Sequence, residues 1–502
     1  MHRDLSALPA LRDALGDAFG ADAVLTSPEA RTAFARDALR PHRGFATMTE
    51  LEQLPLAVVQ PSSTADVVRL VHIAHQHGIP LVPFGGGSGL MGGALSVHPG
   101  IVVDMKRMNR VLSLDTQALT VQVQSGIRLR PLGEYLVQHG LLLGHDPWSI
   151  SVATVGGAIS TNGLGYLGGR YGSMADQVLG LEAVLGNGAV IRTPAARKRS
   201  TGPDLSTLLI GAEGTLGIIT EATLQVFPQP ERQSLIGFTF PDFASGFQAL
   251  LDMQQRGVRP TSMDLSLDTW PTELQERRAE LHIDIDTDAT QDFAQDSALP
   301  YLVLVFEGLE QEVAVQRDLA STIVSSYGAI LEDNPADLDT YWSTRHAVAD
   351  RWAEDPDHRE GTWLDTPGGK AQLDFLHMTI PVAKLLNFRL QAAAVLDTSP
   401  VQLCQEAVWI WPECYSLVLY CSPLQTADAA GGMRQTTDAI LQLGQDIGGS
   451  IEYVHGMGVR FGHLAQRELG SGMAVLHSLK ASLDPAGIMN PGKLGLSSPF
   501  KR

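Results

Sequence analysis

Apolar and polar residues follow two different rhythms along the chain, and these rhythms predict its helices and strands. In 118–126 the apolar positions recur at every second residue, which predicts a strand with one buried face. Between two apolar runs, Asn187 and Gly188 form a dipeptide that is typical of hairpin turns. The elements predicted up to residue 230 are strands at 56–61, 81–85, 100–108, 118–126 and 217–228, a helix at 65–78 and a hairpin at 179–193.

After Pro228 and Pro230 the pattern changes to repeated strand–helix–strand units with fewer glycines. Such units predict an antiparallel sheet with helices on one face, as in ferredoxin-like domains. Residues 340–380 are rich in Trp and His and carry no assigned element. The three predicted units are 235–241, 242–256 and 261–268; 301–308, 310–327 and 328–332; and 415–423, 425–447 and 450–456.

Together the two patterns predict an α+β chain of two closely packed domains, because 502 residues exceed what one compact core usually holds. The first domain is expected at 1–230, with its core at 51–230, and the second at 231–480. The segment 481–502, a helix end followed by Pro and Gly turns, is expected to return to the first domain. Leucines at helical spacing predict an amphipathic helix within residues 1–20.

Charge and composition narrow the function classes. The net charge of −19 and the pI near 5.2 argue against a nucleic acid partner, because phosphate binding needs a basic surface. No run of about 18 apolar residues occurs, so we expect no membrane-spanning helix. The first residues lack the features of a signal peptide, which predicts a cytoplasmic protein. The cysteines, Cys404, Cys414 and Cys421, form no CxxC pair, so neither a zinc cage nor an iron–sulfur cluster is expected.

Glycine is concentrated in three loops of the first domain. PFGGGSGLMGG (83–93) follows an apolar strand, and successive amides in such a loop form a concave site that suits a pyrophosphate. The loop is neither GxGxxG nor GxxxxGKS, so it is not a Rossmann loop or a P-loop. In the second cluster (144–188), the run ATVGGAIST (153–161) offers hydroxyls and bare backbone to a flat ring system with polar edges. The third cluster, 200–224, again permits close backbone approach.

In their order and spacing, these loops resemble the FAD-binding domain of the vanillyl alcohol oxidase and p-cresol methylhydroxylase superfamily. The resemblance rests on VPFGGGSGL, GHDPWS, TVGGAISTN, RYGSMADQVLGLEAVLGNG, STGPDL and GAEGTLGIITEATL. VHGMGVR (454–460) and LDPAGIMNPGKL (483–494) extend it over almost the whole chain. The resemblance implies a two-subdomain FAD-binding domain of the p-cresol methylhydroxylase type, followed by a ferredoxin-like α+β cap domain that holds the substrate.

The resemblance also implies which residues bind FAD. Family members that anchor FAD covalently through this domain have a histidine after the first glycine loop, where this chain has Ser88 and Gly89. Tyr171 and Gly172 supply no cysteine either, so non-covalent FAD is expected. The residues expected to bind FAD are Phe84, Gly85, Gly86, Gly87, Ser88, Gly89, Pro147, Thr154, Gly157, Thr161, Gly214, Gly217, Ile218 and Asn490.

Hydride transfer is the chemistry of the cofactor, and the protein usually supplies a base. The first candidate is His455, which ends the predicted strand at 450–456 before a glycine loop and has Arg460 close by in the sequence; the alternative is a turn histidine. The second is Arg345, beside His346, which could clamp a carboxylate or be a solvated helix residue. The third is Tyr415, which could equally be a core residue.

The resemblance leaves three functions open. D-2-hydroxyacid dehydrogenases share the HGxG motif and often bind a metal through a His-rich segment and a glutamate just before that motif. Here Val454 occupies the glutamate position and 411–422 has no histidine, so no metal site is predicted. Alkyldihydroxyacetonephosphate synthase exchanges an acyl for an alkyl group through a flavin adduct, but only His455 of its histidine cluster is present. A non-catalytic flavin-binding subunit is the third.

The leading expectation is an oxidoreductase that moves hydride from a small hydroxy substrate to FAD. The substrate would be a 2-hydroxyacid or a related alcohol. No motif for a second redox centre is present, so oxygen, a quinone or a redox protein would act as the external electron acceptor. A homodimer is compatible with the sequence.

Overall fold

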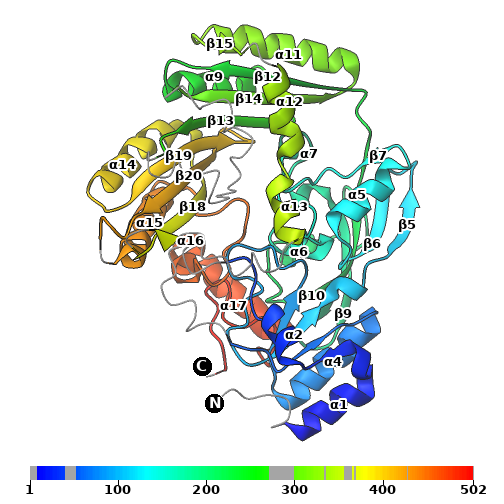
Figure 1. Cartoon of the computed structure of the whole chain (residues 1–502). Coiled ribbons are helices and arrows are strands. Elements are labelled where there is room, and N and C mark those ends of the chain that lie inside the picture. Colours follow the sequence, from blue (N-terminus) through cyan, green and yellow to red (C-terminus); the bar gives the residue numbers. More distant parts are fainter. Residues whose placement is uncertain are drawn as a thin grey trace.

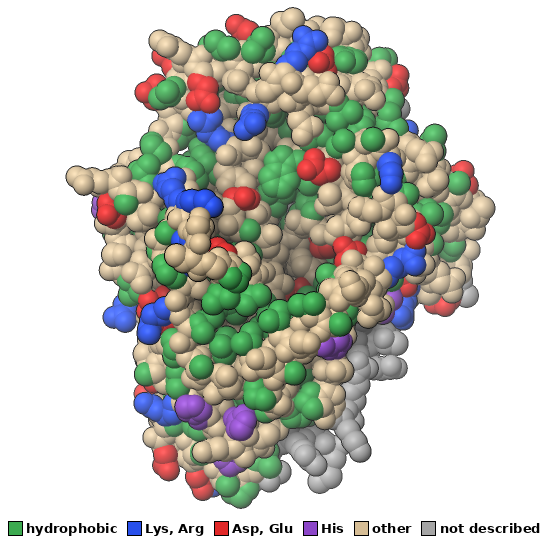
Figure 2. All heavy atoms as spheres, turned by 180° about the vertical axis from the view of Figure 1, so that it is seen from behind, with side chains coloured by type: hydrophobic (Ala, Val, Ile, Leu, Met, Phe, Trp, Pro, Cys, Tyr) green, Lys and Arg blue, Asp and Glu red, His purple; other side chains and the backbone are tan. Residues whose placement is uncertain are grey.

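The computed structural model describes residues 8–39, 53–270, 299–332, 335–354, 365–366, 369–426 and 428–500. Figure 1 shows the helices near the N-terminus in the lower part of the molecule and a large sheet with its helices above and to the left. Within the described residues no helix is long and apolar enough to span a membrane. On the face shown in Figure 2, Lys and Arg side chains are interspersed with Asp and Glu.

The first sheet of the FAD-binding part is built around three parallel strands. Their residues are almost fully buried because helices α1 and α4 cover them. Helix α4 begins where the Ser63 hydroxyl accepts the Asp66 amide at 3.2 Å, and it ends at Gly78 with a φ of 59°. In sheet order the strands are β1 (Val24–Leu25), β2 (Ala57–Val59), β4 (Ile101–Asp104) and β3 (Leu81–Phe84), with helices α1 (Pro9–Phe19), α2 (Pro28–Ala33) and α4 (Thr64–His77).

The second sheet is antiparallel and carries the expected hairpin around Asn187 and Gly188. Helices α5 and α6 share a buried apolar cluster with it. Its strands, in order, are β5 (Val111–Asp115), β6 (Thr120–Gln124), β10 (Gly217–Gln225), β8 (Val178–Leu185) and β9 (Val190–Arg192). The remaining elements are α5 (Leu129–Val137), α6 (Val155–Ser160), α7 (Gly168–Tyr171), α8 (Met174–Gln177) and the pair β7 (Leu141–Leu142) and β11 (Phe227–Pro228).

The cap contains a seven-stranded sheet in which each strand is antiparallel to its neighbours. In β14, Leu302 and Leu304 pack with helices α9 and α11, whereas Val303 and Val305 pack with helix α12 on the other face. The strands in order are β15 (Ile330–Leu331), β12 (Arg232–Thr239), β14 (Tyr301–Gly308), β13 (Ser262–Asp268), β19 (Gln402–Trp409), β20 (Cys414–Cys421) and β18 (Gln372–Thr379). The helices are α9 (Phe243–Gln255), α11 (Glu310–Ser325), α12 (Pro335–Thr344), α13 (Ala347–Glu354), α14 (Leu385–Asp397) and α15 (Ala429–Asp446), and β16 (Asp365–Thr366) pairs with β17 (Gly369–Lys370).

One predicted strand is wrong, and the sequence does not predict strands β1, β5, β7, β16, β17, β18 and β19. In 450–456 only Ser450 forms a bridge, to Thr379; further along, the amides of Val454 and His455 donate to the Glu452 carboxylate and not to a neighbouring strand. Strand β18 lies inside the Trp- and His-rich stretch at 340–380, for which the sequence predicts no element. The helix predicted at the N-terminus is α1, and the expectation for residues 1–7 lies outside the described residues.

The C-terminal part lies against the first sheet of the FAD-binding part. Helices α16 (Ala465–Leu469) and α17 (Gly472–Leu483) lead to a segment that lies beside β3. There the Leu81 amide donates to the Ile488 carbonyl at 2.8 Å, and the Asn490 amide donates to the Leu81 carbonyl at 2.8 Å. Strand β3 ends in the first glycine loop, so this segment supports that loop from behind.

Candidate active site

A cavity lies between the glycine loops of the FAD-binding part and strands of the cap sheet. One wall consists of the loops after β3, around α6 and before β10. The opposite wall comes from strands β18, β19 and β20 and from residues 453–455. Thirteen of the fourteen residues expected to bind FAD line this cavity, from Phe84 to Ile218. The cavity therefore joins residues from both halves of the sequence.

The first glycine loop presents its backbone to the cavity. Residues 85–90 are half-buried, and within the described part of the chain no protein acceptor takes the amide hydrogens of Gly86 to Gly89. A Cβ at Gly86 would overlap the carbonyl oxygen of Val152, and Gly87 has a φ of +71°. The loop thus offers unpaired amide donors in a conformation that requires glycine, which suits a pyrophosphate.

Two further segments complete this wall. Thr154 caps helix α6 by accepting the Gly157 amide at 3.2 Å, and both residues line the cavity with Thr161. In the third loop, Gly214 has a φ of +71°, and a Cβ there would lie 2.8 Å from Pro83. The close contact between the loops explains why small residues occur at these positions.

Asn490, the fourteenth residue expected to bind FAD, does not line the cavity. It is 1% exposed, and its side-chain amide donates to the carbonyls of Gly93 at 2.8 Å and Glu213 at 2.7 Å. Asn490 therefore joins the first and third glycine loops from behind.

His455 lines the cavity from the cap side. The carboxylate of Glu452 accepts the backbone amides of Val454 at 2.8 Å and His455 at 2.9 Å, and it lies 3.6 Å from His455 Nδ1. Burial raises the pKa of Glu452, but its contacts with His455 and the charge of His377 outweigh burial and hold that pKa below its usual range. Glu452 thus holds the backbone of His455 and places a negative charge near its ring.

Sequence reasoning missed three polar residues on the same wall. His377 Nδ1 lies 2.9 Å from Ser416 Oγ, which lies 2.7 Å from Tyr453 Oη. The rings of His377 and His455 meet edge to face, with centroids 4.8 Å apart. The alternation in QLDFLHMT, which places Phe375 and His377 on one face of β18, is the signal that could have found His377.

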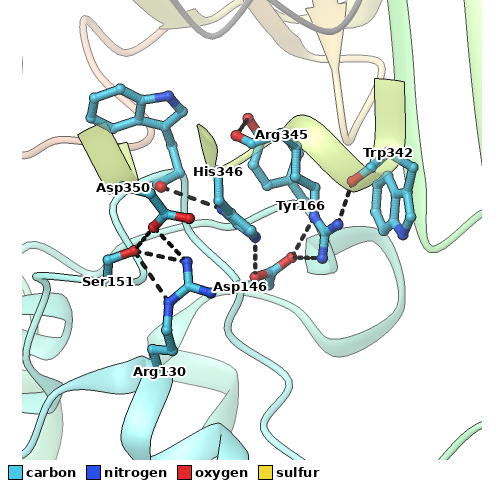
Figure 3. A network of polar contacts seen from close by, with 9 residues as sticks. Arg130, Asp146, Ser151, Tyr166, Trp342, Arg345, His346 and Asp350 are labelled. Atoms are coloured by element: carbon cyan, nitrogen blue, oxygen red, sulfur yellow. Dashed lines mark hydrogen bonds and ion pairs between the residues drawn. The ribbon is translucent and has the colours of Figure 1, made fainter. Parts of the chain in front are cut away.

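Arg345 does not line the cavity but joins the two domains (Figure 3). Its guanidinium lies 2.9 Å from the carboxylate of Asp146 and 4.2 Å from the centre of the Trp342 ring. His346 Nε2 lies 2.8 Å from the same carboxylate. Burial raises the pKa of Asp146, whereas His346 and Arg345 outweigh burial and lower it. Beside this cluster, Arg130 pairs with Asp350 at 2.6 Å.

The structure also places Tyr415 and Arg460 away from the cavity. Tyr415 is 1% exposed in the cap core, where its hydroxyl donates to Glu406 at 2.6 Å and burial raises its pKa. Arg460 is 3% exposed and forms an ion pair with Asp374. His455 lines the cavity, whereas the side chains of Tyr415 and Arg460 do not.

Three buried charged groups, Asp37, Glu213 and Lys493, lie near one another beside the first glycine loop, and Asp37 and Glu213 also line the cavity. Sequence reasoning did not single them out. Burial raises the pKa of Asp37 to about 6 and that of Glu213 to about 7. Burial lowers the pKa of Lys493 to about 8, although both carboxylates oppose this shift. Among the described residues, no cluster of three or more His, Cys, Asp and Glu side chains could hold a metal ion.

Comparison with protein families supports the resemblance over most of the chain. Residues 55–194 match a family model described as an FAD binding domain. Residues 229–494, more than half of the chain, match the C-terminal domain of FAD linked oxidases. These matches confirm FAD as the cofactor.

Known proteins similar to this chain include an oxidase subunit and a probable dehydrogenase. The chain is 26% identical over 463 residues to the glycolate oxidase subunit GlcD of Bacillus subtilis (strain 168), covering 90% of this chain and 92% of the relative. It is 29% identical over 455 residues to a probable mitochondrial D-lactate dehydrogenase of Danio rerio, covering 88% and 84%.

Solved structures confirm the expected fold. An alkyldihydroxyacetonephosphate synthase superposes with a TM-score of 0.73 at 22% identity, covering 96% of this chain and 85% of that one. A substrate-bound p-cresol methylhydroxylase gives 0.74 at 16% identity, covering 98% and 97%. The chain therefore belongs to the FAD-linked oxidases and is an FAD-dependent oxidoreductase.

Proposed function

We propose that this protein oxidises a small hydroxy substrate, a 2-hydroxyacid or a related alcohol, in the cavity between its two domains. The observation that carries the proposal is that His455 of the cap lines the same cavity as the FAD-binding glycine loops. When bound, FAD supplies a two-electron acceptor for hydride. The protein then has to orient the substrate and accept the proton of its hydroxyl group.

His455 is the proposed proton acceptor. A proton on Nδ1 is stabilised by the Glu452 carboxylate 3.6 Å away, which leaves the lone pair of Nε2 for the substrate hydroxyl. His377, held by Ser416, is close enough to orient the same hydroxyl. Arg345 supports this site by holding the cap helices against Asp146, and we assign it no contact with substrate.

FAD is proposed to bind without a covalent bond, through the thirteen cavity-lining residues and with Asn490 as support. Acid precipitation should release all flavin into the supernatant; flavin in the protein pellet would contradict this. The electron acceptor is proposed to be external, as oxygen, a quinone or a redox protein. A cytoplasmic location and a homodimer stay predictions.

Anaerobic mixing of the holoenzyme with D-2-hydroxyacids, aromatic alcohols and acyl-dihydroxyacetone phosphate tests the proposal. A hydroxyacid or an alcohol should bleach the flavin absorbance. His455→Ala should keep FAD but lower the reduction rate about 10²–10⁴-fold, the usual contribution of a general base. His463→Ala is the control, because His463 pairs with Asp438 at the surface. If no compound bleaches the flavin and no fatty acid is released from acyl-dihydroxyacetone phosphate, a non-catalytic flavin-binding subunit replaces the proposal.

A second candidate function is acyl-to-alkyl exchange, as in alkyldihydroxyacetonephosphate synthase. The contact between His377 and His455 at the cavity favours it, because paired imidazoles can serve a reaction that needs both an acid and a base. The two functions give different results in the same panel. With a fatty alcohol added, exchange replaces the acyl group of acyl-dihydroxyacetone phosphate by the alkoxy group of the alcohol and releases a fatty acid without net flavin reduction. Oxidation of an alcohol instead leaves reduced flavin.

A further inference from the structure

The turn that follows His455 is held by a buried carboxylate from the FAD-binding part. Glu213 lies in the third glycine loop and is 5% exposed. Its Oε1 accepts the amides of Met457 at 2.7 Å and Gly458 at 3.0 Å, and its Oε2 also lies 3.0 Å from the Gly458 amide. Glu452 holds the amides on the other side of the same turn. Two carboxylates from different domains therefore hold the backbone on both sides of His455.

The glycines of this turn are required by that arrangement. Gly456 has a φ of +79°, and a Cβ there would lie 2.6 Å from Glu213 Oε1. Gly458 has a φ of +54°, and a Cβ there would overlap the Met91 carbonyl. Met91 belongs to the first glycine loop, and its carbonyl accepts the Val459 amide at 3.0 Å. The turn thus lies between the first and third glycine loops.

Glu213 itself is held in an unusual conformation. Its φ is +48°, in the left-handed region that costs a non-glycine residue free energy. Its backbone amide donates to Ser160 at 2.9 Å, and its carbonyl accepts the side chain of Asn490 at 2.7 Å. The charged groups near its carboxylate are Lys493, which favours the ionised form, and Asp37, which opposes it. The surrounding structure therefore directs this carboxylate at the turn after His455.

We propose that Glu213 is a positioning residue that holds His455 over the FAD-binding loops by fixing the turn formed by Gly456, Met457 and Gly458. The inference rests on the proposed role of His455. Since Glu213 belongs to a loop that lines the cofactor site, binding of FAD and placement of the base become mechanically linked. A base displaced by about 1 Å can cost 10²-fold in rate.

The test compares three variants of the FAD-loaded enzyme. Glu213→Ala should lower the limiting rate of flavin reduction about 10–100-fold, with a much smaller change in the substrate dissociation constant. Glu213→Gln keeps an oxygen that can accept both amides, so its rate should return close to that of the wild type. Glu221→Ala is the control, because Glu221 is partly exposed on β10 and contacts Gln122.

Hydrogen exchange measured by mass spectrometry provides a readout that needs no substrate. Glu213→Ala should speed exchange in the peptide that covers 454–461, and Glu221→Ala should not. A wild-type reduction rate in Glu213→Ala at saturating substrate, or unchanged exchange, would overturn the inference. If no substrate reduces the wild-type flavin, the proposed function fails, but the exchange data still decide whether Glu213 holds the turn.

Discussion

The two walls of the cavity are built from different materials. On the FAD-binding side, the three glycine loops present backbone amides and small side chains, and their glycines are required by close contacts; the larger side chains of His145, Trp148 and Tyr166 lie beside them. On the cap side, it presents the side chains of His377, Ser416, Tyr453 and His455. The first wall suits a cofactor whose shape is fixed, whereas side chains on the second wall can be exchanged to change the substrate. The comparison teaches that family membership fixes the cofactor more firmly than the substrate.

The first prediction tests the wall formed by the glycine loops, called here the backbone wall, by adding a side chain to it. Gly86→Val puts a branched side chain where even a Cβ overlaps the Val152 carbonyl, so the loop must move and FAD binding should be lost. The flavin-to-protein ratio after gel filtration measures this. Gly133→Ala is the matched control: it lies in α5 with no atom within 4 Å of the added Cβ, and it should raise stability by about 0.5–1 kcal/mol. Full flavin content in Gly86→Val would contradict the description of this wall.

The backbone wall could be predicted from the sequence because local sequence determines it. A strand that runs into PFGGGSGL, and a cluster of small residues, predict an anion site and a ring site without any knowledge of tertiary contacts, and the structure shows that both segments line one cavity. Asn490 was expected to bind FAD directly, but its contacts are to Gly93 and Glu213. The sequence places Asn490 among the expected FAD-binding residues, and only the fold shows that it contacts two loops of the cavity wall and does not line the cavity.

The cap wall could not be predicted in the same way, since its residues meet only through sheet pairing. His377 pairs with Ser416 across β18 and β20, at positions 39 residues apart in the chain. Tyr415, the neighbouring residue, has the polar hydroxyl that sequence reasoning selected, yet it points into the core. One residue of register decides which side chain faces the cavity, and a sequence without a predicted β18 does not supply that register.

The second prediction concerns the cluster of Asp146, Arg345 and His346, which connects the FAD-binding part to the cap. Asp146→Ala leaves Arg345 and His346 without their shared carboxylate, at side-chain exposures of 19% and 12%. Removing one partner from a buried ion pair costs about 3–5 kcal/mol, and partial exposure places this case at the lower end. Asp350→Ala breaks the Arg130 pair, whose side chains are about 40% exposed, and should cost about 1 kcal/mol or less. Urea denaturation of both variants checks the difference, and equal losses would contradict it.

The third prediction concerns the buried carboxyl group of Glu213 in the third glycine loop. The pKa of Glu213 is raised from 4.5 to about 7 by burial, so the folded protein holds this proton more tightly than the unfolded chain does. The stability that this group contributes is therefore present below pH 4.5 and lost as the pH rises towards 7. Relative to wild type, Glu213→Gln should become more stable across that interval, by at most about 3 kcal/mol. Denaturation of the apoproteins at pH 5 and pH 7.5 measures it, and a constant difference would exclude the raised pKa.

The smallest effect on the rate of flavin reduction is expected on the cap wall, where His377 contacts His455. His377→Ala removes both the hydrogen bond to Ser416 and the edge-to-face contact with His455, but the backbone of His455 stays held by Glu452 and Glu213. FAD content should stay complete, and the limiting rate of flavin reduction should fall about tenfold, equivalent to ~1.4 kcal/mol in the barrier. His463→Ala again serves as the surface control. A loss as large as that of His455→Ala would make His377 an equal partner in proton transfer, whereas an unchanged rate would leave the cap wall with one functional histidine.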